Sequence, residues 1–238
     1  MNYELDNIDV RVAITKLCEG FPNKYWQKCD REKKYPAEFV SKLTEQGYLG
    51  VLIPEQYGGL GSPISVGAAI LEEIHRSGGN AGACHAQMYT MGTLLRHGSE
   101  KQKSEYLPKI AAGDLRLQAF GVTEPNSGTD TLALSTTAKL IDNSYVVNGQ
   151  KIWTSRAEHS DLLLLLARTT QKESVKNKTD GLSVFIVDMS TVLNKSLRIK
   201  RINTMMNHST TELFFDNMLV PVDNLIGEEG KGFRYILS

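Results

Sequence analysis

The stretch that decides the fold is Gly121-Val122-Thr123-Glu124-Pro125-Asn126-Ser127-Gly128-Thr129-Asp130. It places hydroxyl groups, small residues and backbone amides along one short segment. Small residues let a backbone approach a ligand closely, and hydroxyl and amide groups donate to phosphate oxygens. A second block, Lys151-Ile152-Trp153-Thr154-Ser155, combines a flat apolar side chain with two hydroxyl groups. Together the two blocks are typical of a pocket for a planar ring with a phosphate tail.

The sequence pattern changes near Asp114, between these blocks and the first half of the chain. Before Asp114, apolar residues recur at helical spacing. Helices are predicted over residues 8–17, 36–49, 64–77, 81–97 and 99–112. Ser99, with Gln102 three residues later, predicts a capping box at the start of the last of these helices.

After Asp114, short β-like runs alternate with polar turns, and Asn148-Gly149 is predicted to be one of the turns. The runs cover residues 117–123, 134–141, 145–148, 162–168, 182–187, 197–202 and 212–220. A last helical pattern, from Gly227 to Ser238, has no glycine cap behind it and predicts an unfinished helix. The expected fold class is therefore α+β, with a helical domain at 1–116, a β-rich domain at 117–226 and the start of a second helical domain at 227–238.

Composition excludes several classes of protein. The 27 basic and 27 acidic side chains cancel, which argues against a nucleic-acid partner. The longest aliphatic run, Leu162 to Ala167, is far too short to span a membrane, and the acidic N-terminus lacks an apolar signal core. Three scattered cysteines (Cys18, Cys29 and Cys84) favour a reducing compartment. These features predict a cytoplasmic protein.

Both blocks resemble the flavin-contacting segments of acyl-CoA dehydrogenases, the flavoenzymes that desaturate acyl-CoA thioesters. The resemblance extends over nearly the whole chain and includes three further segments: Ile53 to Gly59, Leu107 to Gly113 and Val220 to Gly227. It implies a helical N-terminal domain, a β-barrel-like middle domain that binds flavin and acyl-CoA, and a C-terminal helical bundle of which only the first turns are present. The implied cofactor is FAD.

The resemblance also implies roles for individual residues. Val122 and Thr123 would meet the pyrimidine edge of the flavin, Gly128 would allow close approach of the backbone, and Trp153 would pack near the dimethylbenzene end. Ser155 would donate toward flavin N5, where a hydroxyl stabilises the reduced ring. The full set of expected cofactor-binding residues is Phe120, Val122, Thr123, Gly128, Thr129, Trp153, Thr154 and Ser155. For either block alone, there is a strong alternative interpretation, in which the block is a strand, a turn and a buried tryptophan that bind no ligand.

Substrate and partner expectations follow from the same resemblance. Thr129 would donate to the pyrophosphate or to the pantetheine of CoA. Asn177 lies in the polar loop 172–180, which would approach the nucleotide end of CoA, although a solvated loop is the alternative interpretation. The expected electron acceptor is an electron-transferring flavoprotein, and the family assembles into homo-oligomers, usually tetramers.

The family mechanism also needs a glutamate that removes the α-proton, and no acidic residue in this sequence matches it. We therefore expect no catalytic residue in the chain, and a truncated protein that binds FAD weakly or not at all. Two other functions stay open: a non-catalytic fragment that binds acyl-CoA or a subunit, and a relative of the acyl-CoA oxidases. The five histidines show neither metal-ligand spacing nor a paired nucleophile, so they are expected in the core or on the surface.

Overall fold

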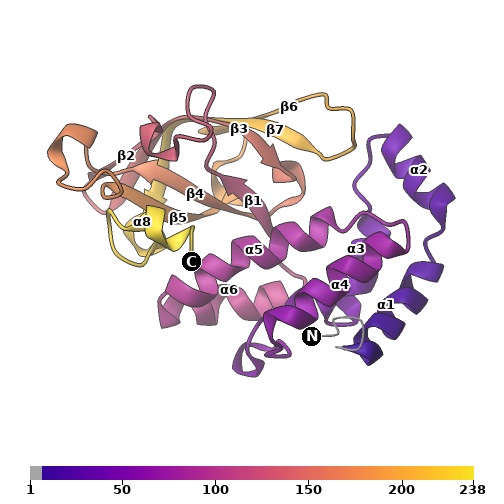
Figure 1. The fold of residues 1–238 in the computed structure, drawn as a ribbon. Coiled ribbons are helices and arrows are strands. Elements are labelled where there is room, and N and C mark those ends of the chain that lie inside the picture. Colours follow the sequence, from indigo (N-terminus) through magenta and orange to yellow (C-terminus); the bar gives the residue numbers. More distant parts are fainter. Residues whose placement is uncertain (1–6) are drawn as a thin grey trace.

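The computed structural model describes residues 7–238 and has helices in its first half and strands in its second (Figure 1). The helices of the first half are α1 (Ile8–Glu19), α2 (Asn23–Arg31), α3 (Ala37–Glu45), α4 (Ile64–Arg76), α5 (Gly82–His97) and α6 (Glu100–Ala112). Short helices in the second half are α7 (Met189–Val192) and α8 (Gly232–Tyr235). Single 3-10 turns are η1 (Tyr48–Gly50), η2 (Glu55–Tyr57), η3 (Thr131–Ala133), η4 (Ala157–His159), η5 (Lys172–Ser174) and η6 (Val222–Asn224).

Five of the long helices follow from the sequence, and α2 does not. The amphipathic patterns of α1, α3, α4 and α5 bury residues at helical spacing, such as Phe39, Val40 and Leu43 in α3. The predicted capping box of α6 is confirmed, because Ser99 accepts from the Gln102 amide and the Gln102 side chain accepts from the Ser99 amide. No residue of α2 is fully buried, and its apolar stripe is short: Tyr25, Trp26 and Cys29 are half-buried, and the two aromatic residues pack against the helical core.

The strands form one open sheet. They are β1 (Leu117–Gly121), β2 (Thr137–Ile141), β3 (Ser144–Ser155), β4 (Leu162–Arg168), β5 (Leu182–Asp188), β6 (Leu197–Arg201), β7 (Thr210–Pro221) and β8 (Leu225–Ile226). Their order is β6-β7-β3-β2-β4-β5-β8, and β1 pairs with β4 in parallel. The predicted helical half followed by a strand-rich half is confirmed.

Two local predictions were wrong. Asn148 and Gly149 do not form a turn between strands, because β3 continues through them and pairs with β7 on both sides of a bulge. Gly149 takes a φ of +148°, a conformation that favours glycine. Because glycine is also common in turns, its presence in the sequence led to the prediction of a turn. The pattern from Gly227 to Ser238 gives a helix only at Gly232–Tyr235.

Of three hydrophobic clusters, one lies among the helices of the first half, and the other two lie on opposite faces of the sheet, separated by β4. Leu163 and Leu165 point into a cluster enclosed by the strands, whereas Leu162, Leu164 and Leu166 point toward α5 and α6. This alternation is the two-residue period of a strand buried on both sides. The helices therefore cover one face of the sheet, and α5 runs beneath β1 (Figure 1). From residue 7 onward, no helix has the length and apolarity needed to cross a membrane.

Candidate functional site

The structure brings the two sequence blocks side by side. β1 ends at Gly121, and the chain continues through Val122 and Thr123 along β3. The amide of Ile152 donates to the carbonyl of Thr123 at 2.8 Å. Val122 and Thr123 are half-buried, and so is Ser155. Residues from the two blocks, about 30 positions apart in the sequence, therefore lie side by side where β3 ends, at one rim of the sheet that is called the edge below.

A β-bulge turns Trp153 outward from this edge. The register between β3 and β7 shifts between Lys151 and Thr154, and Trp153 adopts a φ of +63°. Its side chain remains 56% exposed. A bulky residue in the left-handed region is uncommon, and such strain gathers where a side chain is held for function. Bulges beside active sites re-aim side chains in this way.

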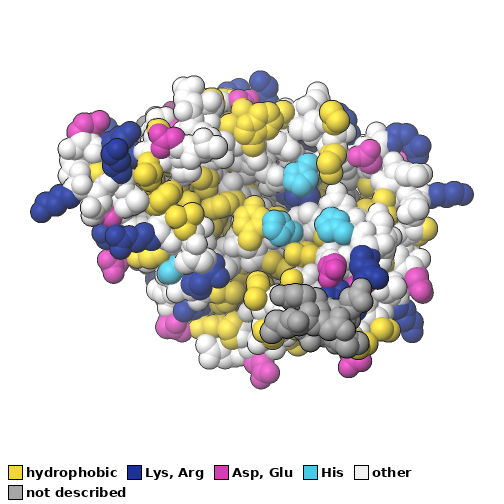
Figure 2. Space-filling view, viewed as in Figure 1, with side chains coloured by type: hydrophobic (Ala, Val, Ile, Leu, Met, Phe, Trp, Pro, Cys, Tyr) yellow, Lys and Arg dark blue, Asp and Glu magenta, His cyan; other side chains and the backbone are white. Residues whose placement is uncertain are grey.

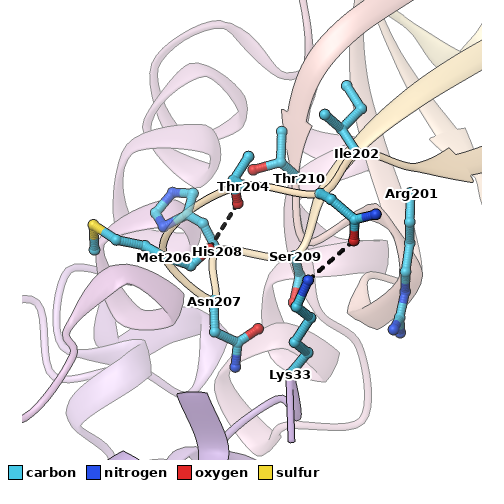
Figure 3. A pocket seen from close by; sticks show the side chains of 10 residues that line it. Lys33, Arg201, Ile202, Thr204, Met206, Asn207, His208, Ser209 and Thr210 are labelled. Atoms are coloured by element: carbon cyan, nitrogen blue, oxygen red, sulfur yellow. Dashed lines mark hydrogen bonds between the residues drawn. The ribbon is translucent and has the colours of Figure 1, made fainter. Parts of the chain in front are cut away.

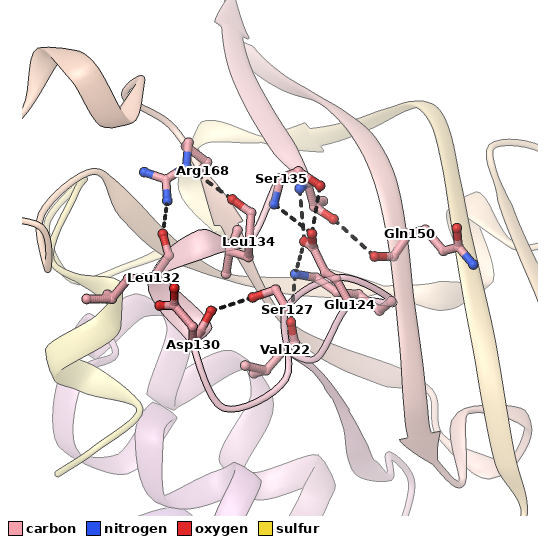
Figure 4. A network of polar contacts seen from close by, with 11 residues as sticks. Val122, Glu124, Ser127, Asp130, Leu132, Leu134, Ser135, Gln150 and Arg168 are labelled. Atoms are coloured by element: carbon pink, nitrogen blue, oxygen red, sulfur yellow. Dashed lines mark hydrogen bonds and ion pairs between the residues drawn. The ribbon is translucent and has the colours of Figure 1, made fainter.

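A buried ion pair fixes the backbone between the blocks (Figure 4). Lys151 Nζ lies 2.8 Å from Glu124 Oε1 and also donates to the Val122 carbonyl at 2.9 Å. The other lone pairs of the Glu124 carboxylate accept from the Ser135 amide and hydroxyl, at 2.6 and 2.8 Å, and from the Thr136 amide, at 2.9 Å. Both charged side chains are buried, and their hydrogen bonds hold the Val122 carbonyl in place.

The ionisation of this pair follows from its surroundings. Burial by itself raises the pKa of Glu124, but the Lys151 charge and the donated hydrogen bonds outweigh it and lower the pKa to about 2. Burial lowers the pKa of Lys151 to about 8, against the opposing effect of the Glu124 charge. Glu124 is therefore an ionised, fully paired carboxylate at neutral pH, which suits a structural anchor and not a general base.

The residues of the second block fit a ring that stacks and accepts hydrogen bonds. Trp153 offers an exposed flat surface, and Ser155 follows it with a half-buried hydroxyl. The hydroxyl of Thr154 is buried and has no hydrogen-bond partner, although the Thr154 carbonyl accepts from Thr211 Oγ1 at 2.7 Å. Trp153 and Ser155 are thus the accessible residues of this block, a flat surface followed by a hydrogen-bond donor. These residues fit the flavin of FAD.

The remaining predicted residues lie in different surroundings. Gly128 and Thr129 are exposed in the turn after Glu124, and a Cβ at Gly128 would meet open space. Asn177 is exposed on the loop between β4 and β5, where its side chain donates to Asp180 Oδ2 at 3.1 Å. Phe120 faces the helices, 5.9 Å from Tyr89 between ring centroids. Phe120 also lines a cavity between β1 and the helices.

That cavity has a volume of about 540 Å³ and lies between α4, α5 and β1. Most of its walls are apolar. They include Leu52, Leu71, Met88, Leu95, Phe120 and Leu164. Its polar lining includes His85 and Tyr89, one turn apart on α5, and Arg96 near the end of the same helix. A mostly apolar cavity with a few polar groups is the usual form of a small-molecule site.

Sequence reasoning missed the group around Arg156. This arginine directly follows the second block, is 5% exposed, and takes a φ of +59°. His208 reaches it from the β6–β7 loop, shown with its neighbours Met206 and Thr204 in Figure 3. Asn207 anchors this loop by donating to the carbonyls of Cys29 and Lys34, at 2.9 and 2.7 Å.

The histidines meet Arg156 from elements far apart in the chain, so their sequence spacing carried no signal. On the face shown in Figure 2, histidine side chains gather among hydrophobic ones near the middle. Burial and then the Arg156 charge lower the pKa of both His85 and His208. The one sequence signal for this group is the position of Arg156 directly after the second block.

Comparisons with known proteins agree with this geometry. The family model for the acyl-CoA dehydrogenase N-terminal domain matches residues 6–114, and that for the acyl-CoA dehydrogenase middle domain matches residues 119–218. The short-chain-specific acyl-CoA dehydrogenase of Clostridium acetobutylicum is 33% identical over 229 residues, covering 94% of this chain and 58% of the relative.

Solved structures show the same fold. The acyl-CoA dehydrogenase of Geobacillus kaustophilus has a TM-score of 0.86 at 31% identity, covering 95% of this chain and 59% of that one. A chain of a structure described as the electron-transferring flavoprotein of Acidaminococcus fermentans also has a TM-score of 0.86, at 29% identity, covering 99% of this chain and 62% of that one. The fold is thus that of the acyl-CoA dehydrogenases.

The chain belongs to the acyl-CoA dehydrogenase family. It spans about three fifths of the length of the relatives that it matches.

Proposed function

We propose that the chain is the FAD- and acyl-CoA-binding part of an acyl-CoA dehydrogenase that desaturates acyl-CoA thioesters between the α and β carbons. The observation that carries the proposal is the meeting of the two blocks: Val122 and Thr123 lie beside Trp153 and Ser155 at one sheet edge. When bound, FAD supplies a two-electron acceptor for the β-hydrogen.

Each part of the edge has a task in this proposal. Trp153 packs against the flavin ring, and Ser155 donates toward N5, where negative charge grows on reduction. Thr154 remains a proposed member of the cofactor-binding set. The Glu124–Lys151 pair holds the Val122 backbone at the pyrimidine edge. Thr129 and Asn177 remain proposed contacts of CoA.

No residue of the chain is assigned as the base that removes the α-proton. Glu124 accepts from Lys151, Ser135 and Thr136, so its carboxylate has no lone pair directed at a substrate. We propose that the base comes from outside the sequence described here. The division into domains at 1–116, 117–226 and 227–238, and a cytoplasmic location in fatty-acid metabolism, belong to the same proposal.

The proposed partners come from the family. An electron-transferring flavoprotein is the proposed electron acceptor, supported by the fold that this chain shares with a component of the Acidaminococcus structure. Association of several copies is proposed for the whole protein.

Visible absorbance tests the function. The purified chain is mixed with FAD, separated from free FAD by gel filtration, and then titrated anaerobically with butyryl-CoA. Flavin bands that travel with the protein support the proposed cofactor site, and bands that bleach with butyryl-CoA mean that a base acts on the bound substrate. Absence of bound flavin at saturating FAD, in chain shown to be folded, contradicts the proposal for this chain.

A further inference from the structure

Arg168, the last residue of β4, joins two segments that lie far apart in the sequence (Figure 4). Its Nη2 donates to the Leu132 carbonyl at 2.7 Å, and its Nε donates to the Leu134 carbonyl at 3.2 Å. Its Nη1 donates to the Thr170 carbonyl at 3.4 Å, at the start of the β4–β5 loop. In the part of the chain that the structure describes, the hydrogen-bond partners of this half-buried guanidinium are therefore backbone carbonyls.

The first of these segments, residues 132–136, lies outside the strands of the sheet. Its backbone groups therefore need partners other than a neighbouring strand. Two charged side chains supply them. Arg168 donates to two carbonyls near the start of the segment, and the Glu124 carboxylate accepts from the amides of Ser135 and Thr136 at its end.

The turn at residues 125–130 comes directly before this segment and carries the exposed Thr129, a proposed contact of CoA. The turn is braced from within, because Ser127 Oγ donates to the Asp130 carbonyl at 2.6 Å. A turn braced in this way keeps its own shape, so its orientation depends on the segments at its two ends. Glu124 holds one end, and Arg168 holds the other.

The second segment that Arg168 contacts is the loop that carries Asn177, the other proposed contact of CoA. The Thr170 amide donates to the Gly181 carbonyl at 3.2 Å, which closes the base of this loop. Within the loop, Asn177 Nδ2 donates to Asp180 Oδ2 at 3.1 Å. Both proposed CoA contacts thus belong to segments that end at the Arg168 guanidinium.

The edge that carries Trp153 is held by different contacts. β3 pairs with β7 on both sides of the bulge, and Lys151 Nζ donates to the Val122 carbonyl at 2.9 Å. The Arg168 side chain takes part in none of these interactions. Loss of its guanidinium should therefore loosen the turn and the loop and leave the edge in place.

We propose that Arg168 is a positioning residue for CoA, which fixes the turn that carries Thr129 relative to the loop that carries Asn177, and that it has no such role for the flavin ring. This inference rests on the proposed acyl-CoA function and assigns to it a residue that touches neither ligand. A guanidinium suits the task, because its donors point in fixed directions from one plane.

Hydrogen exchange followed by mass spectrometry tests the holding role without any ligand. In Arg168→Gln, peptides that cover residues 126–134 should exchange about tenfold faster or more, because the segment loses two hydrogen bonds. Peptides from β3 and β7 should keep their wild-type rates. Unchanged exchange at 126–134 overturns the proposal. A rise throughout the chain also overturns it, because it shows a general loss of stability.

Binding measurements test the positioning role. Calorimetric titration should show butyryl-CoA binding to Arg168→Gln about tenfold more weakly than to the wild type. Titration with FAD, followed by fluorescence, should give the same affinity in both proteins. A purely structural role predicts that both affinities fall together, so equal losses contradict the proposal, and so does an unchanged affinity for butyryl-CoA.

Two further variants control for charge and for folding. CoA carries phosphates, so a positive charge also attracts it from a distance. Arg198→Gln removes the same charge from an exposed position on β6, where the guanidinium lies 4.5 Å from the Phe214 ring centroid, and should leave both affinities unchanged. Weakening of butyryl-CoA binding in Arg198→Gln as large as in Arg168→Gln overturns the positioning role.

Arg168→Lys keeps the charge but lacks the planar set of donors, so its affinity for butyryl-CoA should lie between those of the wild type and Arg168→Gln. The backbone amide at position 168 donates to the Thr136 carbonyl at 2.8 Å and is retained in both variants. If Arg168→Gln does not fold, the comparison of wild type with Arg168→Lys decides, and equal affinity for butyryl-CoA counts against the proposal.

The outcomes separate this inference from the proposed function. A wild-type chain that binds FAD but has no affinity for butyryl-CoA contradicts the acyl-CoA function, and the positioning role falls with it. Butyryl-CoA binding that Arg168→Gln leaves unchanged contradicts the positioning role alone and leaves the acyl-CoA function intact.

Discussion

At the scale of residues, the Glu124–Lys151 pair explains why the signature stretch contains a glutamate that touches no ligand. The pair is buried between β1 and β3, and Lys151 also holds the Val122 carbonyl. Removing one partner of such a pair leaves an uncompensated buried charge, which costs far more than the pair contributes. The glutamate is therefore required for the shape of the edge that carries Trp153.

Glu124→Gln should reduce the free energy of unfolding by about 3–5 kcal/mol, because the Lys151 ammonium loses its counter-charge in the interior. Urea denaturation measures the change. The matched control is Asp223→Asn, which breaks an exposed pair with Lys101 and should cost at most about 1 kcal/mol. Equal losses of unfolding free energy in the two variants would contradict a larger stabilisation by the buried pair than by the exposed one.

The same carboxylate sets a pH dependence. The pKa of Glu124 is about 2 in the folded chain, below its ordinary value of 4.5. The ionised pair therefore stabilises the fold fully above pH 4.5, and this contribution is lost as the pH falls toward 2. The stability difference between wild type and Glu124→Gln should shrink over that window when urea midpoints are compared. A difference that stays constant down to pH 2 would assign the acid sensitivity to other groups.

Sequence could predict the residues that belong to contiguous motifs, but not the group around Arg156. Val122, Thr123, Trp153 and Ser155 stand in two short blocks, and their proximity follows from adjacent strands. The contact of Arg156 with His208 joins β3 to the β6–β7 loop across 52 positions, and it depends on the tertiary fold. For that reason the histidines were expected to be ordinary core or surface residues.

At the scale of elements, local chemistry predicted most helices and the strands with clear alternation. The exception α2 is held by aromatic contacts and not by a buried stripe: Trp26 packs edge-on to Phe39 with ring centroids 4.8 Å apart. Tertiary contacts of this kind override weak local preference. β3 was cut short in the prediction because Gly149 signals a turn, whereas in the fold it occupies a bulge.

The capping box of α6 offers a test at this scale. Ser99→Ala removes the side-chain acceptor for the Gln102 amide and should lower the free energy of unfolding by about 1 kcal/mol. Ser104→Ala, an exposed position within the same helix, is the control and should change it little or raise it slightly. Thermal or urea unfolding measures both. A loss in Ser104→Ala as large as that in Ser99→Ala would contradict the role of the cap.

At the scale of the whole molecule, the helical half and the sheet are joined by packing and by specific polar contacts. Leu162, Leu164 and Leu166 of β4 share a cluster with Met91 and Leu94 of α5. Thr90 Oγ1 donates to the Leu117 carbonyl at 2.5 Å, which links α5 directly to β1. The cavity between the halves and the edge that carries Trp153 therefore have fixed positions relative to each other, as the proposed site for a ring and an acyl chain requires.

The central claim is that the edge carrying Trp153 is the flavin site, and fluorescence tests it most directly. The chain has two tryptophans, so Trp26→Phe leaves Trp153 as the sole reporter. Titration with FAD should quench its emission strongly, ADP should leave it unchanged because ADP lacks the ring, and Ser155→Ala should shift the quenching to higher FAD concentration. Bound FAD that leaves Trp153 emission unchanged, or quenching that ADP reproduces, would contradict the account.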